Sequence, residues 1–195
     1  MLYLILGGAR SGKSDFAERL AADSGRPVLY VATMEPGDDE MRDRIARHRA
    51  SRPAAWRTLE APRDLARQIA GAAQAGDFVI LDCLTLWLTN LLLDLLPDAE
   101  QPRTEDLPAA LDRVAAEVES LLDWGRSHAG DVAVVSNEVG MGLVPPYPLG
   151  RVFRDALGAA NRRIAAHADE TYLLVAGLVF PLRALGATSI DHLDA

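Results

Sequence analysis

The chain has 195 residues, of which 49% are apolar, 25% charged and 6% aromatic. This composition is typical of a globular protein and excludes disordered and collagen-like chains. The net charge is −8, from 28 acidic and 20 basic side chains, so a general nucleic-acid scaffold is excluded and we expect no nucleic-acid partner. The first 60 residues nevertheless carry ten basic and nine acidic side chains, and any bound anion is expected there.

The chain shows no feature of a membrane or secreted protein. No uncharged apolar run approaches the roughly 18 residues that a membrane span requires, and the first six residues lead into glycines without a basic signal segment. The single cysteine, Cys83, can form no internal disulfide, and no cysteine and histidine cluster predicts a structural zinc. We therefore expect a cytoplasmic protein with no membrane span.

Short apolar runs predict strands that are buried on both faces of a sheet. These runs are Tyr3–Leu6, Val28–Thr33, Phe78–Asp82, Val132–Ser136 and Thr171–Ala176. Helical periodicity lies between them, in the stretches 16–20, 107–121 and 152–164, and the loop 97–108 is expected to be exposed. Alternating strands and helices predict an α/β fold, with a mostly parallel central sheet and helices on both faces. Without an internal repeat or a linker, we expect a single domain over residues 1–195.

A phosphate-binding loop follows the first predicted strand. Residues Gly7-Gly8-Ala9-Arg10-Ser11-Gly12-Lys13-Ser14 fit the pattern G-x-x-x-x-G-K-[ST]. In such a loop, backbone N–H groups wrap a phosphate, the lysine reaches the terminal phosphates and the hydroxyl ligates Mg2+. Lys13 is the only lysine beside 19 arginines, and the loop interior accommodates a compact ammonium rather than a planar fork. The alternative, a fortuitous glycine-rich turn, is disfavoured by the flanking strand and helix.

Asp82 is the second candidate residue for nucleotide chemistry. It ends a buried run, at the carboxyl edge where α/β proteins bind ligands, and a carboxylate there can hold Mg2+ directly or through water. The alternative is a helix cap, although Thr85 could serve as the cap instead. We therefore predict that Ser14 and Asp82 form an Mg2+ site.

His48 is the candidate nucleophile. Met41, Ile45 and His48 recur at spacings of four and three, which places His48 on the apolar stripe of a predicted helix. The arginines around it are Arg44, Arg47, Arg49 and Arg52. They would lower the pKa of His48 and keep the imidazole neutral, as a nucleophile or a general base requires. The alternative is a half-buried structural histidine beside a solvated arginine face.

Several blocks of sequence together resemble one enzyme family. They are Gly7–Ser14, Tyr30-Val31-Ala32-Thr33, Asp39-Glu40-Met41, Arg44-Ile45, His48, Arg52-Pro53, Trp56-Arg57-Thr58 and Asn137-Glu138-Val139-Gly140-Met141-Gly142. The family is the bifunctional adenosylcobinamide kinase/adenosylcobinamide-phosphate guanylyltransferase (CobU/CobP type) of cobalamin biosynthesis. The resemblance runs from Tyr3 to about Gly177. The His48 block and the Asn137–Gly142 block are the specific part, because the phosphate-binding loop alone indicates only a superfamily.

The resemblance implies a RecA-like P-loop fold and two reactions. Adenosylcobinamide is phosphorylated by GTP or ATP, and GMP then passes from GTP to adenosylcobinamide phosphate through a covalent GMP–histidine. The catalytic residues implied are His48 and Lys13, with Mg2+ as the cofactor, and the trimers of the family imply a homo-oligomer. The nucleotide contacts implied are Gly7, Gly8, Ala9, Arg10, Ser11, Gly12, Lys13, Ser14, Thr33, Met34, Glu35, Arg49, Ala50, Ser51, Arg52, Glu60 and Asp82.

Three further interpretations stay open from the sequence. The nearest rival function is a P-loop kinase of another small metabolite, in which His48 is structural. The segment Asn137–Gly142 predicts either a mobile loop over the substrate or an ordinary glycine-rich turn. Trp56 either stacks on a base or anchors its loop, and we favour the anchor.

Overall fold

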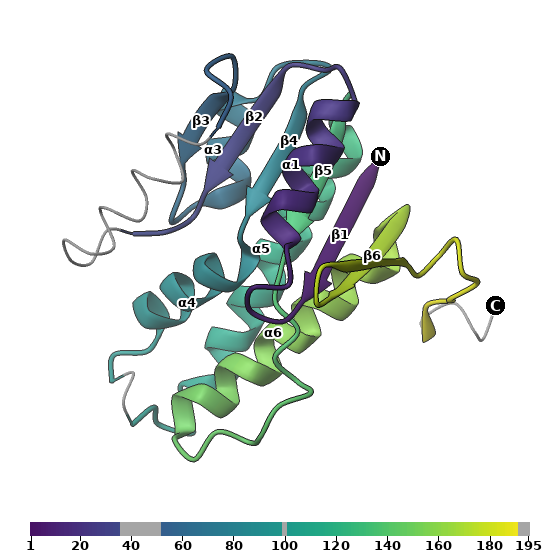
Figure 1. The fold of residues 1–195 in the computed structure, drawn as a ribbon. Helices are drawn as coiled ribbons and strands as arrows, with labels where there is room; N and C mark the ends of the chain where they lie inside the picture. Colours follow the sequence, from purple (N-terminus) through teal and green to yellow (C-terminus); the bar gives the residue numbers. More distant parts are fainter. Residues whose placement is uncertain (36–51, 99–100, 191–195) are drawn as a thin grey trace.

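A computed structural model of the chain describes residues 1–35, 52–98 and 101–190. Helices and strands alternate along it (Figure 1). Their order is β1 (Leu2–Gly7), α1 (Lys13–Asp23), β2 (Val28–Ala32), β3 (Arg57–Glu60), α3 (Leu65–Ala72), β4 (Phe78–Asp82), α4 (Leu84–Leu95), α5 (Leu107–Ser127), β5 (Asp131–Val135), α6 (Pro148–His167), β6 (Glu170–Val175) and β7 (Leu178–Pro181).

The strands form one seven-stranded sheet in the order β3-β2-β4-β5-β1-β6-β7. Neighbouring strands are parallel except for β6 and β7, which pair antiparallel. The predicted mostly parallel α/β fold is therefore confirmed. Each strand predicted from the sequence is present, with bounds that differ by at most one residue. Because β1 lies inside the sheet, the phosphate-binding loop that follows it emerges between neighbouring strands rather than at an outer edge.

Helices cover both faces of the sheet, as predicted. Alternate residues of each strand point to opposite faces, so Leu4 packs into a core formed with α3, α4, α5 and α6, whereas Ile5 packs into a core formed with α1. Figure 1 shows α1 on one side of the strands and the long helices α5 and α6 on the other. Among the described residues, no helix is long and apolar enough to cross a membrane.

The sequence did not predict β3, β7, α3 or α4, and three of these omissions have a physical reason. β3 has the sequence RTLE and no buried residue, so it lacks the apolar run that marks an inner strand. α4 reads LTLWLTNLLLDL and is apolar nearly all round, which leaves no helical period to detect. β7 follows β6 through Ala176 and Gly177, whose φ angles of 52° and 81° suit a type I′ hairpin turn.

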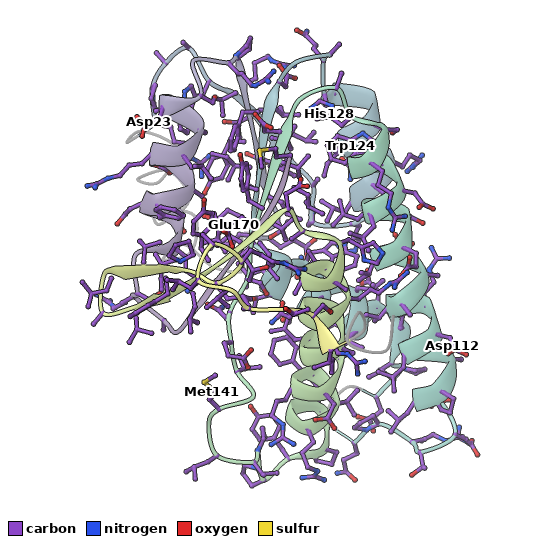
Figure 2. The ribbon with its side chains drawn as sticks, turned by 90° about the vertical axis from the view of Figure 1, so that its right-hand side faces the viewer. Asp23, Asp112, Trp124, His128, Met141 and Glu170 are labelled. Carbon is purple, nitrogen blue, oxygen red and sulfur yellow. The ribbon has the colours of Figure 1, made fainter. Side chains whose placement is uncertain are left out.

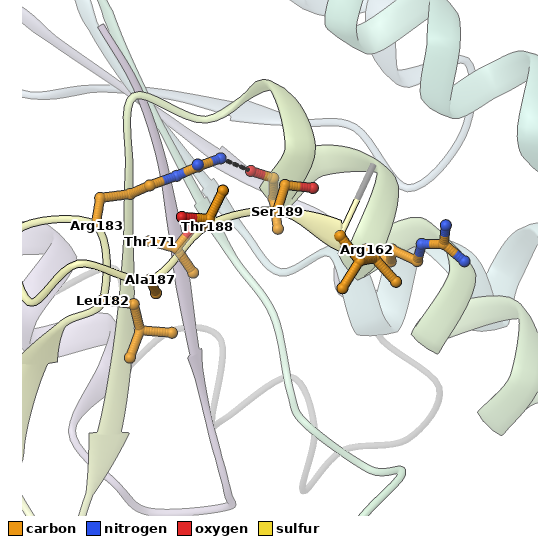
Figure 3. A pocket seen from close by; sticks show the side chains of 9 residues that line it. Arg162, Thr171, Leu182, Arg183, Ala187, Thr188 and Ser189 are labelled. Carbon is orange, nitrogen blue, oxygen red and sulfur yellow. Dashed lines mark hydrogen bonds between the residues drawn. The ribbon is translucent and has the colours of Figure 1, made fainter. Parts of the chain in front are cut away.

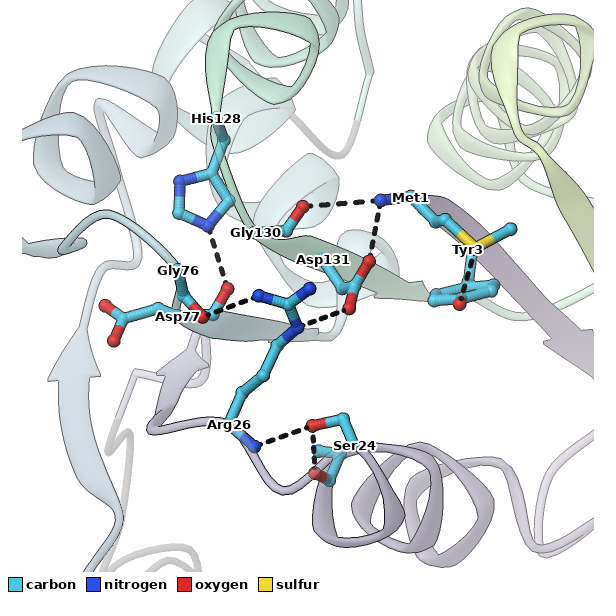
Figure 4. Close-up of polar contacts among 10 residues, drawn as sticks. Met1, Tyr3, Ser24, Arg26, Gly76, Asp77, His128, Gly130 and Asp131 are labelled. Atoms are coloured by element: carbon cyan, nitrogen blue, oxygen red, sulfur yellow. Dashed lines mark hydrogen bonds and ion pairs between the residues drawn. The ribbon is translucent and has the colours of Figure 1, made fainter.

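The amino edge of the sheet is held by a polar network (Figure 4). Asp131 accepts a 2.7 Å hydrogen bond from the terminal amine of Met1. It also forms an ion pair with Arg26, whose Nε lies 2.9 Å from the carboxylate. His128 Nε2 lies 2.9 Å from the carbonyl oxygen of Asp77. These residues lie at the end of the sheet opposite the phosphate-binding loop, and His128 therefore serves the structure.

Candidate functional site

The loop between β1 and α1 bends as phosphate-binding loops do. Gly12 caps α1 with a φ of 92°, a conformation that side-chain-bearing residues rarely adopt. At Gly7 a Cβ atom would lie 2.5 Å from the carbonyl oxygen of Leu174 on β6, so only glycine fits there. The loop therefore delivers the N-terminus of α1, with its unpaired N–H groups, to the carboxyl edge of the sheet.

Lys13 is buried within this loop. Its side chain is 8% exposed, and Nζ donates a 2.6 Å hydrogen bond to the carbonyl oxygen of Gly8. Burial lowers the pKa of Lys13, and the negative charge of Asp82 opposes that shift. The hydroxyl of Ser11 is also buried, with no hydrogen-bond partner among the described residues. A phosphate oxygen is the type of acceptor that these donors require.

Asp82 ends β4 beside this loop. Its Oδ2 accepts a 2.5 Å hydrogen bond from the hydroxyl of Tyr30, which lies on the neighbouring strand β2. Burial raises the pKa of Tyr30, and the adjacent charge of Asp82 raises it further, so the hydroxyl remains a donor. The oxygens of Ser14 and Asp82 suit Mg2+, which is held by one or two protein oxygens together with substrate phosphates. Within residues 1–35, 52–98 and 101–190, no cluster of three or more His, Cys, Asp or Glu side chains that could hold a metal ion occurs.

Arg52 contacts the ring of Tyr30 rather than an open surface. The guanidinium carbon lies 3.3 Å from the ring centroid, a cation–π contact. Arg52 is therefore connected, through the ring and hydroxyl of Tyr30, to Asp82 at the carboxyl edge of the sheet. Its predicted contact with a nucleotide stays a prediction.

The structure gives Thr33 and Glu35 other partners. Thr33 is fully buried, and its hydroxyl donates to the Cys83 carbonyl at 2.7 Å and accepts from the Cys83 N–H at 3.0 Å. Glu35 is exposed and forms an ion pair with Arg63. Their nucleotide contacts, and that of the neighbouring Met34, stay predictions. Ala32 on β2 is paired with Glu60 on β3 and with Asp82 on β4. Glu60 and Asp82 therefore lie at the same level along their strands, at the carboxyl edge of the sheet.

Four predicted site residues lie outside the described residues: His48, Arg49, Ala50 and Ser51. The predicted helix that carries His48 lies there too. The structure therefore tests neither the nucleophile nor this part of the nucleotide site.

Sequence reasoning missed the role of Tyr30. A tyrosine within a strand buried on both faces needs a partner for its hydroxyl, and the aspartate that ends a nearby strand is the natural one. That signal was present in the sequence. It could be used only once β2 and β4 were known to be neighbours.

Three other features do not belong to the site. Burial raises the pKa of the Cys83 thiol to about 11, which keeps it neutral and supports its interpretation as a small core residue. A cavity of about 200 Å³ lies between α6, β6 and the C-terminal segment (Figure 3). It contains Thr171 near the amino end of β6, far along the strand from the phosphate-binding loop. Trp56 packs against the core beside α1, as the anchor interpretation predicted.

Comparisons with known proteins place the chain in a family. A bifunctional adenosylcobalamin biosynthesis protein CobP of Pseudomonas aeruginosa is 49% identical over 183 residues, which cover 94% of this chain and 98% of that protein. A CobU protein of Escherichia coli with the same description is 43% identical and covers 91% of this chain and 97% of its own length. An ATPase from the type III secretion system of pathogenic bacteria shares the fold alone, with a TM-score of 0.53, 12% identity, and coverage of 99% of this chain and 60% of that one.

The family model for cobinamide kinase / cobinamide phosphate guanyltransferase matches residues 3–182. The match includes the phosphate-binding loop, Asp82 and the segment Asn137–Gly142. With the two bacterial relatives, it shows that the chain belongs to the cobinamide kinase / cobinamide phosphate guanyltransferase family.

Proposed function

We propose that this chain performs both reactions of its family in adenosylcobalamin biosynthesis. It phosphorylates adenosylcobinamide with GTP or ATP, and it then transfers GMP from GTP to the resulting phosphate, releasing pyrophosphate. The observation that carries the proposal is the 49% identity, along 94% of the chain, to a relative described as bifunctional. The buried lysine and the aspartate at the carboxyl edge support it, because phosphoryl transfer requires such groups beside the nucleotide.

The kinase step rests on the loop Gly7–Ser14. N–H groups at the start of α1 bind the β- and γ-phosphates, and Lys13 exchanges its bond to the Gly8 carbonyl for one to the terminal phosphate. Ser14 and Asp82 would hold Mg2+, which when bound would neutralise charge on the phosphates. The substrate hydroxyl attacks the γ-phosphorus and releases its proton to water, and the bond to the β-phosphate oxygen breaks.

The guanylyl step rests on His48. The neutral imidazole attacks the α-phosphorus of GTP, a P–N bond forms, and the bond to pyrophosphate breaks. Arg49 and Arg52 stabilise the charge that develops on pyrophosphate. A phosphate oxygen of adenosylcobinamide phosphate then attacks the same phosphorus, and the P–N bond breaks. Histidine is restored and adenosyl-GDP-cobinamide is released.

The proposal extends to the setting of the enzyme. We expect one catalytic domain over residues 1–195, a cytoplasmic location and a homo-oligomer such as a trimer. The nearest alternative is a P-loop kinase of another small metabolite, in which His48 is structural.

One experiment separates the proposed function from that alternative. The protein is mixed with Mg2+ and GTP labelled at the α-phosphate, then denatured and tested for label that resists alkali and is released by acid. We expect such label on the wild type and on His167→Ala, and none on His48→Ala. His167 is a suitable control because it lies on α6, where its Nδ1 contacts the carbonyl of Arg163.

The opposite results are equally informative. A wild type that binds GTP but retains no label would overturn the covalent intermediate and favour the kinase alternative. Label that persists on His48→Ala would assign the nucleophile to another residue. Phosphorylation of adenosylcobinamide, followed separately, tests the kinase step in the same preparations.

A further inference from the structure

The segment after β5 exposes an unusual group of large apolar side chains. Met141, Leu143, Val144 and Tyr147, which we call the apolar loop, are 83%, 96%, 62% and 59% exposed. Figure 2 shows Met141 projecting from the segment on the side away from α6. Single exposed apolar residues are ordinary, but four large ones between residues 141 and 147 are unusual, and exposed apolar surface of this kind is typical of an interaction site.

The base of the apolar loop is attached to the phosphate-binding loop. The N–H of Glu138 donates a 3.2 Å hydrogen bond to the carbonyl oxygen of Gly7. One residue earlier, the carbonyl oxygen of Asn137 accepts a 3.0 Å bond from Nδ2 of the buried Asn161. Val139 packs against the core beside α6. The first residues of the segment are therefore partly buried, and Glu138 connects them to the phosphate-binding loop.

The far end of the apolar loop is equally ordered. Nη1 of Arg151 donates to the carbonyl oxygens of Pro145 and Pro146, at 3.1 and 2.8 Å. The ring of Tyr147 lies over Gly150, where a Cβ atom would be 2.4 Å from a ring carbon. A segment held at both ends, with apolar side chains turned to solvent, is preorganised for a ligand.

We infer that the apolar loop binds the corrin ring of the cobinamide substrate, an inference that rests on the proposed function. The reacting hydroxyl or phosphate is at the end of a short arm, and it must reach a nucleotide held by the residues from Gly7 to Ser14. The ring that carries the arm is too large to enter that loop, so it must lie on an adjoining surface. The apolar loop begins three residues after Glu138, whose N–H is bonded to Gly7, and ligand sites are lined mainly by apolar side chains of this type.

A second copy of the chain is a less suitable occupant. A stable interface between proteins uses roughly 20–30 residues on each side. The apolar loop offers four large side chains. It follows Glu138, which is bonded to Gly7, and a permanent subunit contact so close in the chain to the phosphate-binding loop would obstruct a large substrate.

The test compares Leu143→Ser with Leu185→Ser. Both leucines are largely exposed, at 96% and 67%, and neither belongs to the phosphate-binding loop. We expect Leu143→Ser to raise the KM for cobinamide about fivefold or more, since burying a leucine contributes that much binding. The KM for the nucleotide and kcat should change less than about twofold. Leu185→Ser should have the KM for cobinamide of the wild type. The double variant with Met141→Ser and Leu143→Ser should have a higher KM for cobinamide than Leu143→Ser alone.

Direct binding and oligomeric state complete the test. Equilibrium dialysis with cobinamide should show the same loss of affinity for Leu143→Ser, and sedimentation should show an unchanged assembly. An unchanged KM and affinity in Leu143→Ser, with an active wild type, would overturn the inference and leave the proposed function intact. Dissociation of an oligomer by the substitution would also overturn it, because the apolar loop would then be a subunit contact. A wild type that binds nucleotide but neither binds nor phosphorylates cobinamide would overturn the proposed function itself.

Discussion

The hydroxyl of Tyr30 and the carboxylate of Asp82 are joined by a 2.5 Å hydrogen bond between neighbouring strands. The bond fixes the orientation of the carboxylate, because Tyr30 is buried and its ring is packed between the sheet and α1. Arg52 lies on the same ring. Tyr30 is therefore a positioning residue for the Mg2+ ligand we propose, and it links that ligand to Arg52.

Replacing Tyr30 with phenylalanine should weaken the response to Mg2+. Without its donor, Asp82 can rotate, and we expect the Mg2+ concentration needed for half-maximal GTP binding to rise about tenfold or more, as removal of a hydrogen bond to a charged metal ligand predicts. The measurement is a Mg2+ titration of nucleotide binding at fixed GTP, with turnover recorded alongside.

The matched control is Tyr3→Phe, which removes a hydroxyl that contacts the sulfur of Met1. Its Mg2+ requirement should equal that of the wild type. If Tyr30→Phe also equals the wild type, the bond to Asp82 serves only the fold.

Replacing Lys13 should abolish phosphoryl transfer even when the positive charge is kept. The ammonium occupies a site that is 8% exposed and is bonded to Gly8, and a guanidinium is larger and planar. We expect both Lys13→Ala and Lys13→Arg to lose at least about a hundredfold in kcat, in line with the loss of an electrostatic stabiliser. Arg19→Ala, on the exposed side of α1, should retain full activity in the same assay. Activity of Lys13→Arg near that of the wild type would show that charge alone suffices.

The fold was largely predictable because its inner strands are buried on both faces. β1, β2, β4, β5 and β6 appear in the sequence as continuous apolar runs, and such runs need no knowledge of their neighbours to be identified. β3 and β7 are the outer strands of the sheet. Each of them pairs with a neighbouring strand on one side only, so the continuous apolar run that identifies an inner strand is absent.

The candidate site was predictable where it is local in sequence. The residues from Gly7 to Ser14 are adjacent in the chain, and their pattern alone specifies the turn. The Tyr30–Asp82 bond joins residues 52 positions apart and depends on the register of β2 against β4. The burial of Thr33 likewise depends on Cys83 and Asn90, which approach it only in the folded chain. No pattern within one segment contains that information.

Alanine at Gly130 should destabilise the protein, whereas alanine at Gly158 should stabilise it. At Gly130 a Cβ atom would lie 1.9 Å from the carbonyl oxygen of Asp77, so two backbone segments must separate. We expect a loss of about 1–3 kcal/mol in the free energy of unfolding, as for other overpacked sites. At Gly158, an exposed helical position of α6, a Cβ atom meets nothing within 4 Å. Alanine there should add about 0.5–1 kcal/mol, because glycine is a poor helix former. Urea unfolding of both variants checks the pair, and equal stability of Gly130→Ala and the wild type would contradict the close approach.

The ion pair between Glu119 on α5 and Arg163 on α6 should give the protein a small stability that depends on pH. Arg163 donates two hydrogen bonds to the carboxylate, one of 2.9 Å to Oε2, and these bonds lower the pKa of Glu119. A carboxyl whose pKa is lower in the folded state stabilises the fold above its unfolded pKa, and this contribution is lost as the pH falls through the folded value. Both side chains are largely exposed, so solvent screening limits the contribution to about 1 kcal/mol or less.

The measurement is the free energy of unfolding of Glu119→Gln and the wild type at pH 7 and at pH 3. We expect the wild type to be more stable at pH 7, and the difference to shrink at pH 3 and in high salt, because both conditions weaken the pair. Asp112→Asn is the control, since it neutralises an exposed acid on the same helix (Figure 2). A difference between Glu119→Gln and the wild type that is the same at both pH values would mean that packing of the side chain, rather than its charge, joins α5 to α6.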